Sequence, residues 1–166
     1  MKRTKFGQFM YNITYKFSAF IDKHQWLYWL LILTHGILES LIGFIIALGL
    51  ILLGNKAHRN HRGIYFIIGN NWGGFSMGFV SVVADNMGES YTTRTIGHEC
   101  GHSYQVCLFG VLWFFIVGIP SQLRYLRDLY CRKHNKTCPE YDSVWFEGEA
   151  TDFGRDYCIK GENDNG

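Results

Sequence analysis

His98-Glu99-Cys100-Gly101-His102 is the stretch of this sequence that says most about its fold. It follows the pattern H-E-x-x-H, in which two histidines four residues apart share one face of an α-helix. From that face both imidazoles can bind one zinc ion, through bonds of about 2.0–2.1 Å. Glu99 lies between them and can accept a proton from a zinc-bound water molecule. The stretch therefore predicts a helix with a Zn²⁺ site, in which His98 and His102 are ligands and Glu99 is the catalytic base.

A catalytic zinc ion also needs a third protein ligand. Residues 103–109 contain no further histidine, so a carboxylate from a second helix is favoured. The downstream candidates are Glu140, Asp142, Glu147, Glu149, Asp152 and Asp156, together with His134.

One downstream segment, Trp145-Phe146-Glu147-Gly148-Glu149-Ala150-Thr151, resembles the second zinc-binding helix of the gluzincin metallopeptidases. In their aminopeptidases a Glu followed by Gly-x-Ala supplies the third ligand. The integral-membrane CAAX prenyl protease and heat-shock protease group has a similar E-x-x-A segment, and its first motif has Gly before the second His, like Gly101. The resemblance implies a zincin-like unit with Glu147 as third ligand. Thr151 stands where the membrane proteases have Asp, and Glu149 remains an alternative ligand.

The layout of the chain is also similar to that of small bacterial membrane proteins of the metallopeptidase type. Those proteins have an H-E-x-G-H helix, then an apolar stretch ending in Gly-x-Pro-Ser, here residues 118–121, and a late Glu. This similarity implies a metallopeptidase-like protein of the bacterial inner membrane, without naming its reaction.

The composition limits the classes of function. A chain of 166 residues is the size of one domain. Its formal charge is +2, and the Lys and Arg residues are spread out, so no basic stripe for a nucleic-acid backbone is present in the sequence. The apolar residues, in contrast, gather in a few blocks, which indicates a membrane protein.

The longest apolar block runs from Trp26 to Leu53 and contains no Lys, Arg or Asp and only one Glu. Its 28 residues exceed the roughly 20 that cross a bilayer as a helix. It predicts one transmembrane helix. The uncharged residues 106–120 are too few to span alone and predict a buried, re-entrant or interfacial segment. The charges on its two flanks are too similar to assign an orientation. His35 and Glu39 share one face of this block, either toward the active site or toward each other or an oligomer partner.

The remaining elements predict an α+β fold. Two strands, 63–69 and 75–85, should form a hairpin around the Gly-rich turn 70–74. A helix over 94–107 should be capped by Ser90, Thr92 or Thr93. Pro120 should end or kink the apolar segment before it. A helix over 123–130 and a last helix over 143–157 follow. The predicted domains are an aromatic and basic interfacial leader (1–25), the transmembrane helix (26–54), a zincin-like unit (55–159) and a disordered tail (160–166).

Further side chains are candidates for supporting roles. Acidic partners for the histidines are sought among Asp152, Asp85 and Glu89. An electrophile for the oxyanion is sought among Tyr141, Tyr157 and His134. Cys100 points away from the histidine face and is interpreted as a packing residue, and Cys131 and Cys138 could form a disulfide in an oxidising compartment.

The leading hypothesis is a membrane-anchored zinc metallopeptidase that hydrolyses a peptide or protein substrate near the bilayer. Two alternatives stay open: a zinc hydrolase of a non-peptide amide, and a non-catalytic membrane protein that keeps the metal site. Because little chain remains for a deep groove, a homo-oligomer or a membrane partner could complete it.

Overall fold

The computed structural model describes residues 3–69, 73–85 and 88–159, and the fold is α+β, as the sequence predicts. The helices are α1 (Lys5–Lys23), α2 (Gln25–Thr34), α3 (Ile37–Leu52), α4 (Glu89–Phe109), α5 (Ile119–Lys133) and α6 (Trp145–Phe153). The strands are β1 (His58–Arg59), β2 (Ile64–Ile67), β3 (Gly74–Met77) and β4 (Val80–Val83). Short helical turns are η1 (Gly110–Leu112), η2 (Phe114–Gly118), η3 (Tyr141–Ser143) and η4 (Gly154–Ile159). The predicted disordered tail, 160–166, lies outside the described residues.

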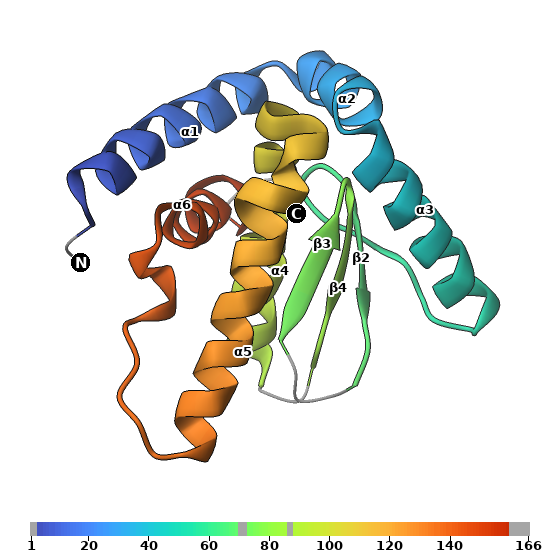
Figure 1. Cartoon of the computed structure of the whole chain (residues 1–166). Coiled ribbons are helices and arrows are strands. Elements are labelled where there is room, and N and C mark those ends of the chain that lie inside the picture. The colour runs from blue at the N-terminus through green and yellow to red at the C-terminus, as the bar shows by residue number, and fades with distance from the viewer. Residues whose placement is uncertain (1–2, 70–72, 86–87, 160–166) are drawn as a thin grey trace.

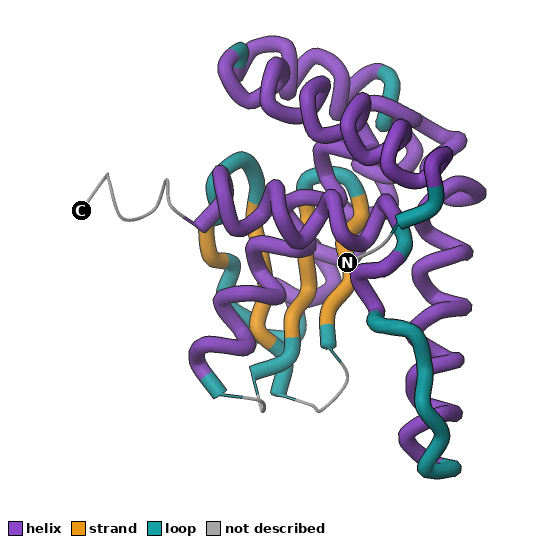
Figure 2. Tube along the Cα trace, turned by 90° about the vertical axis from the view of Figure 1, so that its left-hand side faces the viewer, coloured by secondary structure: helices purple, strands orange, loops and turns teal. Residues whose placement is uncertain are grey.

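A small sheet with the strand order β1-β2-β4-β3 lies between helices (Figures 1 and 2). Helix α3 packs on the sheet through Gly43, which lies against Met77 and Val80, and α4 contacts β3 and β4 on the other side. All four residues of β4 are buried, as expected for a central strand covered on both faces. Strand β3 forms the sheet edge nearest α4.

The predicted hairpin is wrong in its pairing. Residues 64–67 form a strand, but the segment predicted as one strand over 75–85 is two, β3 and β4, joined at Gly78. Gly78 has φ of +59°, which allows the tight reversal, and a Cβ there would lie 2.6 Å from Cα of Ser40. The hairpin is therefore β3–β4, and β2 pairs with β4 in parallel. The three residues 70–72 of the predicted turn lie outside the described residues.

The predicted transmembrane helix over 26–54 is also wrong as a single helix. The block is divided into α2 and α3, which meet at an angle of 88° near Gly36. The close approach of the Gly36 backbone to α4 explains the break, because a Cβ on Gly36 would lie 2.5 Å from Cγ1 of Val106 in α4. Ser40 donates a hydrogen bond to the carbonyl of Ile32 across the bend, and His35 Nδ1 lies 3.1 Å from the carbonyl of Cys107. Polar residues whose burial in a bilayer would cost free energy in a straight transmembrane helix thus stabilise a bend through hydrogen bonds.

Within the described ranges, no one helix has the length and apolar character needed to cross a membrane. Two pairs of helical segments are long and apolar enough when each pair is taken together, but both pairs are bent. They are α2 with α3 and residues 89–112 with 114–133, and the second pair is bent by 116°. The second bend lies between residues 112 and 114, shortly after Gly110 with its φ of +51°, and not at Pro120. Pro120 instead occupies the first turn of α5, where its missing N–H costs nothing.

The leader predicted over 1–25 forms a helix, α1, that packs on the rest of the molecule. Ile21 of α1 and Tyr28 of α2 belong to the main hydrophobic core with Tyr104 of α4 and Phe153 of α6. The predicted helix over 94–107 lies within the longer α4, which begins after Gly88 without a side-chain cap. The predicted helices over 123–130 and 143–157 correspond to α5 and to α6 with η4.

Candidate metal centre

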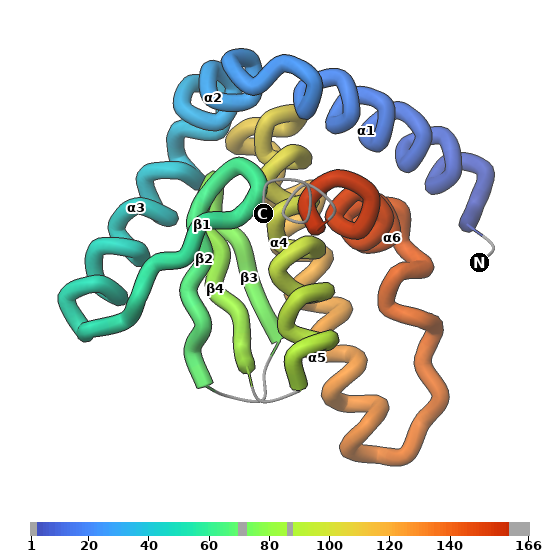
Figure 3. The backbone as a smooth tube through the Cα atoms, turned by 180° about the vertical axis from the view of Figure 1, so that it is seen from behind, coloured from blue at the N-terminus to red at the C-terminus, as the bar shows by residue number. Residues whose placement is uncertain are grey.

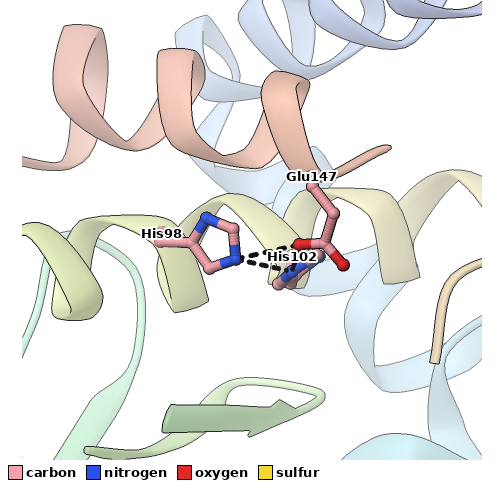
Figure 4. Close-up of side chains that lie close together, drawn as sticks. All are labelled: His98, His102 and Glu147. Atoms are coloured by element: carbon pink, nitrogen blue, oxygen red, sulfur yellow. Dashed lines mark hydrogen bonds and ion pairs between the residues drawn. The ribbon is translucent and has the colours of Figure 1, made fainter. Parts of the chain in front are cut away.

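The two histidines of the motif lie on the face of α4 that is turned toward α6 (Figure 4). Their positions, one helical turn apart, bring Nε2 of His98 to 3.1 Å from Nε2 of His102. His102 is buried, and the side chain of His98 is only 15% exposed. Both rings therefore present the same nitrogen to one small, enclosed region.

Glu147 completes this group from the first turn of α6. Its Oε2 lies 3.2 Å from Nε2 of His98 and 3.4 Å from Nε2 of His102. The residue is fully buried, and neither carboxylate oxygen has a hydrogen-bond partner. A buried carboxylate without a donor is costly unless a charge compensates it. The three residues form a triad whose ligand atoms lie within 4.8 Å of one another.

The triad fits a tetrahedral metal ion. Ligands bound at about 2.0–2.1 Å in tetrahedral geometry lie about 3.3–3.4 Å apart, and the separations here are 3.1, 3.2 and 3.4 Å. Two imidazoles with one carboxylate are also a donor set that zinc uses in catalytic sites, where a fourth position stays open. Zn²⁺ therefore fits the donor atoms by chemistry and by spacing.

Without a cation, the triad is a coupled ion pair. Burial alone would raise the pKa of Glu147, but His102 and His98 face its carboxylate and hold that pKa well below its ordinary value. Burial alone would lower the pKa of His102, yet Glu147 raises it to about 9. In the metal-free triad the carboxylate is thus ionised and His102 is protonated, so a metal ion would bind with release of the imidazole proton.

Close contact between two helices sets the geometry of the triad. A Cβ on Gly101 would lie 2.7 Å from Cα of Ala150, and a Cβ on Gly154 would collide with Gly97. Small residues at these crossing points let the backbones of α4 and of α6 with η4 touch. Gly101 of the motif and Ala150 of the downstream segment therefore have a structural role in bringing Glu147 to the histidines.

Glu99 lies on the adjacent face of α4, against the edge strand. A Cβ on Gly74 of β3 would lie 2.9 Å from Oε1 of Glu99, so this glycine leaves the space that the carboxyl group occupies. Burial raises the pKa of Glu99 above its ordinary value. A carboxyl group with a raised pKa is better suited to general acid–base chemistry near neutral pH.

Hydrogen bonds orient both imidazoles through their other nitrogen. Nδ1 of His98 lies 2.9 Å from Oγ1 of Thr151, which donates in turn to Asp142 at 3.2 Å. Thr151 therefore links His98 to a carboxylate. From the sequence alone, Thr151 is only a departure from the membrane-protease pattern, and Asp142 is a candidate zinc ligand. Their role in orienting His98 depends on the tertiary structure.

A second chain of hydrogen bonds orients His102. Its Nδ1 lies 2.8 Å from Oε1 of Gln105, whose amide nitrogen donates to Glu149 and to the carbonyl of Phe146. Glu149 also accepts a hydrogen bond from Ser18 of α1 at 3.1 Å, and burial raises its pKa to about 7. The alternative ligand Glu149 thus lies behind His102, and the triad contains Glu147 instead.

The other predicted supporting residues are distributed as follows. Tyr141 lies near the triad, with its ring 6.3 Å from that of His98 and its hydroxyl 3.1 Å from that of Ser121. Tyr157 stacks on Phe153, and the ring of His134 lies tilted against that of Tyr130 at the end of α5. Of the three proposed electrophiles, the structure places Tyr141 beside the site, and burial together with Glu147 raises its pKa, so its hydroxyl stays a donor.

The acidic candidates have other positions. Asp152 accepts a hydrogen bond from Tyr11 and pairs with Arg155, and Glu89 is the first residue of α4. Asp85 lies just beyond Ala84, which follows the end of β4. His35 and Glu39 belong to the bend between α2 and α3 and are not among the residues of the triad.

The cysteines hold the same region together. Cys100, interpreted from the sequence as a packing residue, is paired with Cys158 of η4, which links the motif helix to the end of the chain. Cys131 and Cys138 are paired as well, as considered from the sequence, and Cys107 is free and buried.

Comparison of the chain with protein-family models, with curated proteins and with solved structures gave no match. The assignment of a function therefore depends on the site itself.

Proposed function

We propose that this chain is a zinc-dependent peptidase of the zincin type, held at a membrane, with His98, His102 and Glu147 as zinc ligands and Glu99 as general base. The observation that carries the proposal is the buried carboxylate of Glu147, which has no hydrogen-bond donor and faces two imidazole nitrogens at 3.2 and 3.4 Å. A purely structural site would need no carboxyl group such as Glu99 beside the ligands. Glu99 favours the hydrolytic function over a non-catalytic one.

The edge strand offers a way to bind a peptide. Strand β3 is hydrogen-bonded to β4 on one side and is last in the strand order, next to α4 and Glu99. An extended peptide can add to such an edge through its backbone, whatever its side chains. This placement would bring a peptide bond alongside Glu99, and it favours a peptide over another amide as substrate.

Each residue around the triad would then have a separate role in peptide hydrolysis. Bound zinc would supply Lewis-acid polarisation of the carbonyl group and a more acidic water molecule. Glu99 would take the proton of the attacking water and pass it to the departing amine. Tyr141 would donate a hydrogen bond to the developing oxyanion. Thr151 and Gln105 would hold His98 and His102 in the orientation that directs Nε2 at the metal.

The test combines metal content with hydrolysis. Mass spectrometry of purified protein should find one zinc ion per chain in wild type and in the matched controls Glu99→Gln and Glu149→Gln. His98→Ala and Glu147→Gln should lose it. Hydrolysis of a fluorogenic peptide library should fall about 10²- to 10⁴-fold in Glu99→Gln. A folded wild type without zinc would refute the proposal, and zinc binding without any Glu99-dependent hydrolysis would leave the non-catalytic alternative.

A further inference from the structure

The chain returns to the beginning of the apolar block, residues 26–53, through the connector that follows the block. Asp22, just before the block, lies 2.6 Å from Nε2 of His61, just after it, and Arg62 donates to the backbone carbonyl of Asp22 at 2.9 Å. Figure 3 shows β1 and the loop after it at the same end of the molecule as α2, with α3 running away and the chain returning. If the block crossed a membrane, Asp22 and His61 would instead lie on opposite sides of it, about 30 Å apart.

Helix α1, which precedes the block, is bound to the domain that follows it. Tyr11 and Tyr15 donate hydrogen bonds of 2.7 Å to Asp152 and Asp156, and Ser18 donates to Glu149. Tyr104 of the motif helix donates to Asp22 at 2.7 Å. These contacts require that α1 and the metal centre lie on the same side of any bilayer.

An exposed strip of α1, beside its exposed lysines, is apolar, and it belongs to a larger surface over α2 and α3. Phe6 and Trp26, for example, are 68% and 66% exposed. We define the outer apolar surface as Phe6, Phe9, Ile13, Phe20, Trp26, Leu30, Leu33, Ile37, Leu38, Leu41, Phe44, Ile45, Leu48, Ile51 and Leu52, with Val111, Leu112, Phe115 and Ile119 from the second bend. A surface of this extent exceeds what monomeric proteins expose to water.

The two bends of this surface lie side by side. Gly36, in the first bend, packs on Val106, which precedes the second bend. Gly110 packs on the backbone of His35, because a Cβ added to Gly110 would lie 2.6 Å from the carbonyl oxygen of His35. Exposed basic residues occur in the segments that carry this surface and in the connector after it, at Lys5, Lys16, Lys23, Lys56 and Arg59. Basic and aromatic residues around an apolar face are typical of helices that lie in the membrane interface, where cations meet anionic headgroups.

We infer that the outer apolar surface binds one leaflet of a lipid bilayer, so that the chain enters and leaves the membrane on the side of the metal centre. The inference rests on the membrane association in the proposed function and replaces the transmembrane anchor with a monotopic one. It would hold a peptidase at the bilayer surface with its edge strand on the same side as both ends of the chain.

Topology tests this directly. Full-length protein with a different protease-cleavable tag at each end is reconstituted into sealed vesicles of phosphatidylcholine with phosphatidylglycerol, and protease is added outside. We expect both tags to be cut on the same molecules or both protected. One tag cut and the other protected would overturn the inference, since the block would then cross the membrane.

Flotation with the same vesicles tests the surface itself. Phe44→Asp combined with Leu48→Asp should lower the ratio of bound to free protein about a hundredfold, because each apolar side chain contributes about tenfold or more. Leu129→Asp is the matched control, an exposed leucine on α5 outside the surface, and should leave the ratio unchanged. A discrete water-soluble dimer that does not float would overturn the inference and make the surface a subunit interface.

Zinc content is measured in every preparation, so the two proposals can fail separately. Protein that binds one zinc ion but does not float refutes only the membrane surface. Protein that floats with both tags on one side but lacks zinc supports the membrane surface and refutes the metal site.

Discussion

Gly101→Ala should weaken zinc binding although residue 101 is not a ligand. The added Cβ would lie 2.7 Å from Cα and 2.9 Å from the carbonyl carbon of Ala150, whereas ordinary contacts begin at 3.4 Å. The carbonyl oxygen of Ala150 would lie closer still, so helices α4 and α6 must separate by at least about 0.7 Å, the difference between 3.4 and 2.7 Å. Zinc sites tolerate only about 0.2 Å in ligand distance. Glu147 would move away from His98 and His102, and zinc affinity should fall tenfold or more.

The effect on stability is smaller because two terms oppose each other. Overpacking costs about 1–3 kcal/mol, and replacing Gly by Ala inside a helix returns about 1 kcal/mol. The metal-free protein should therefore lose about 0–2 kcal/mol in its free energy of unfolding. Gly49→Ala is the matched control, because no atom lies within 4 Å of its added Cβ. It should stabilise the chain by up to about 1 kcal/mol without changing zinc affinity.

Two measurements check this prediction. Competition with a chromophoric chelator gives zinc affinity, and chemical unfolding of the metal-free protein gives stability. Equal zinc affinity in Gly101→Ala and wild type would refute the argument that helix contact sets the metal geometry.

Three further predictions concern the groups around the triad. Thr151→Val should lower zinc affinity about 10- to 100-fold, because His98 loses its link to Asp142; unchanged affinity in the chelator assay would exclude an orienting role. Tyr141→Phe should keep its zinc but lower kcat about 10- to 1,000-fold, and an unchanged kcat would show that Tyr141 does not stabilise the oxyanion. Burial alone would raise the pKa of Asp22, but hydrogen bonds from His61 and Tyr104 hold that pKa below its ordinary value. The Asp22 carboxylate therefore stabilises the fold above about pH 4. This stabilisation is lost as the pH falls through the pKa of Asp22 in the folded protein. Asp22→Asn should therefore cost about 1–3 kcal/mol at pH 7 and clearly less at pH 3 in urea unfolding, and an equal cost at both values would contradict this.

The sequence predicted the centre of the site because its geometry is local. Residues four apart on a helix share a face whatever the rest of the chain does, and the structure does place the Nε2 atoms of His98 and His102 3.1 Å apart. Helix α4 and the α+β class were predicted from similarly local patterns. Glu147 was chosen by resemblance among several carboxylates, and its place in the triad depends on the contact of Gly101 with Ala150.

The errors in the fold concern features that depend on distant residues. An apolar run of 28 residues is long enough for a span, but Gly36 packs against Val106, 70 positions later, and the run bends there. Strand pairing likewise depends on residues far apart in the chain. Strand β2 pairs in parallel with β4, which α3 and α4 cover, and not across the Gly-rich turn with the strand that follows it.

The sequence by itself determined the helix that carries His98 and His102, the apolar character of residues 26–53 and the set of carboxylates from which a third ligand could come. Helical spacing and composition are properties of neighbouring residues. Only the tertiary structure decided which carboxylate faces the histidines, how Thr151 and Gln105 orient them, and that the chain after the apolar block returns to Asp22. Each of those depends on contacts between segments far apart in the chain, and such contacts are selected by the packing of the whole molecule.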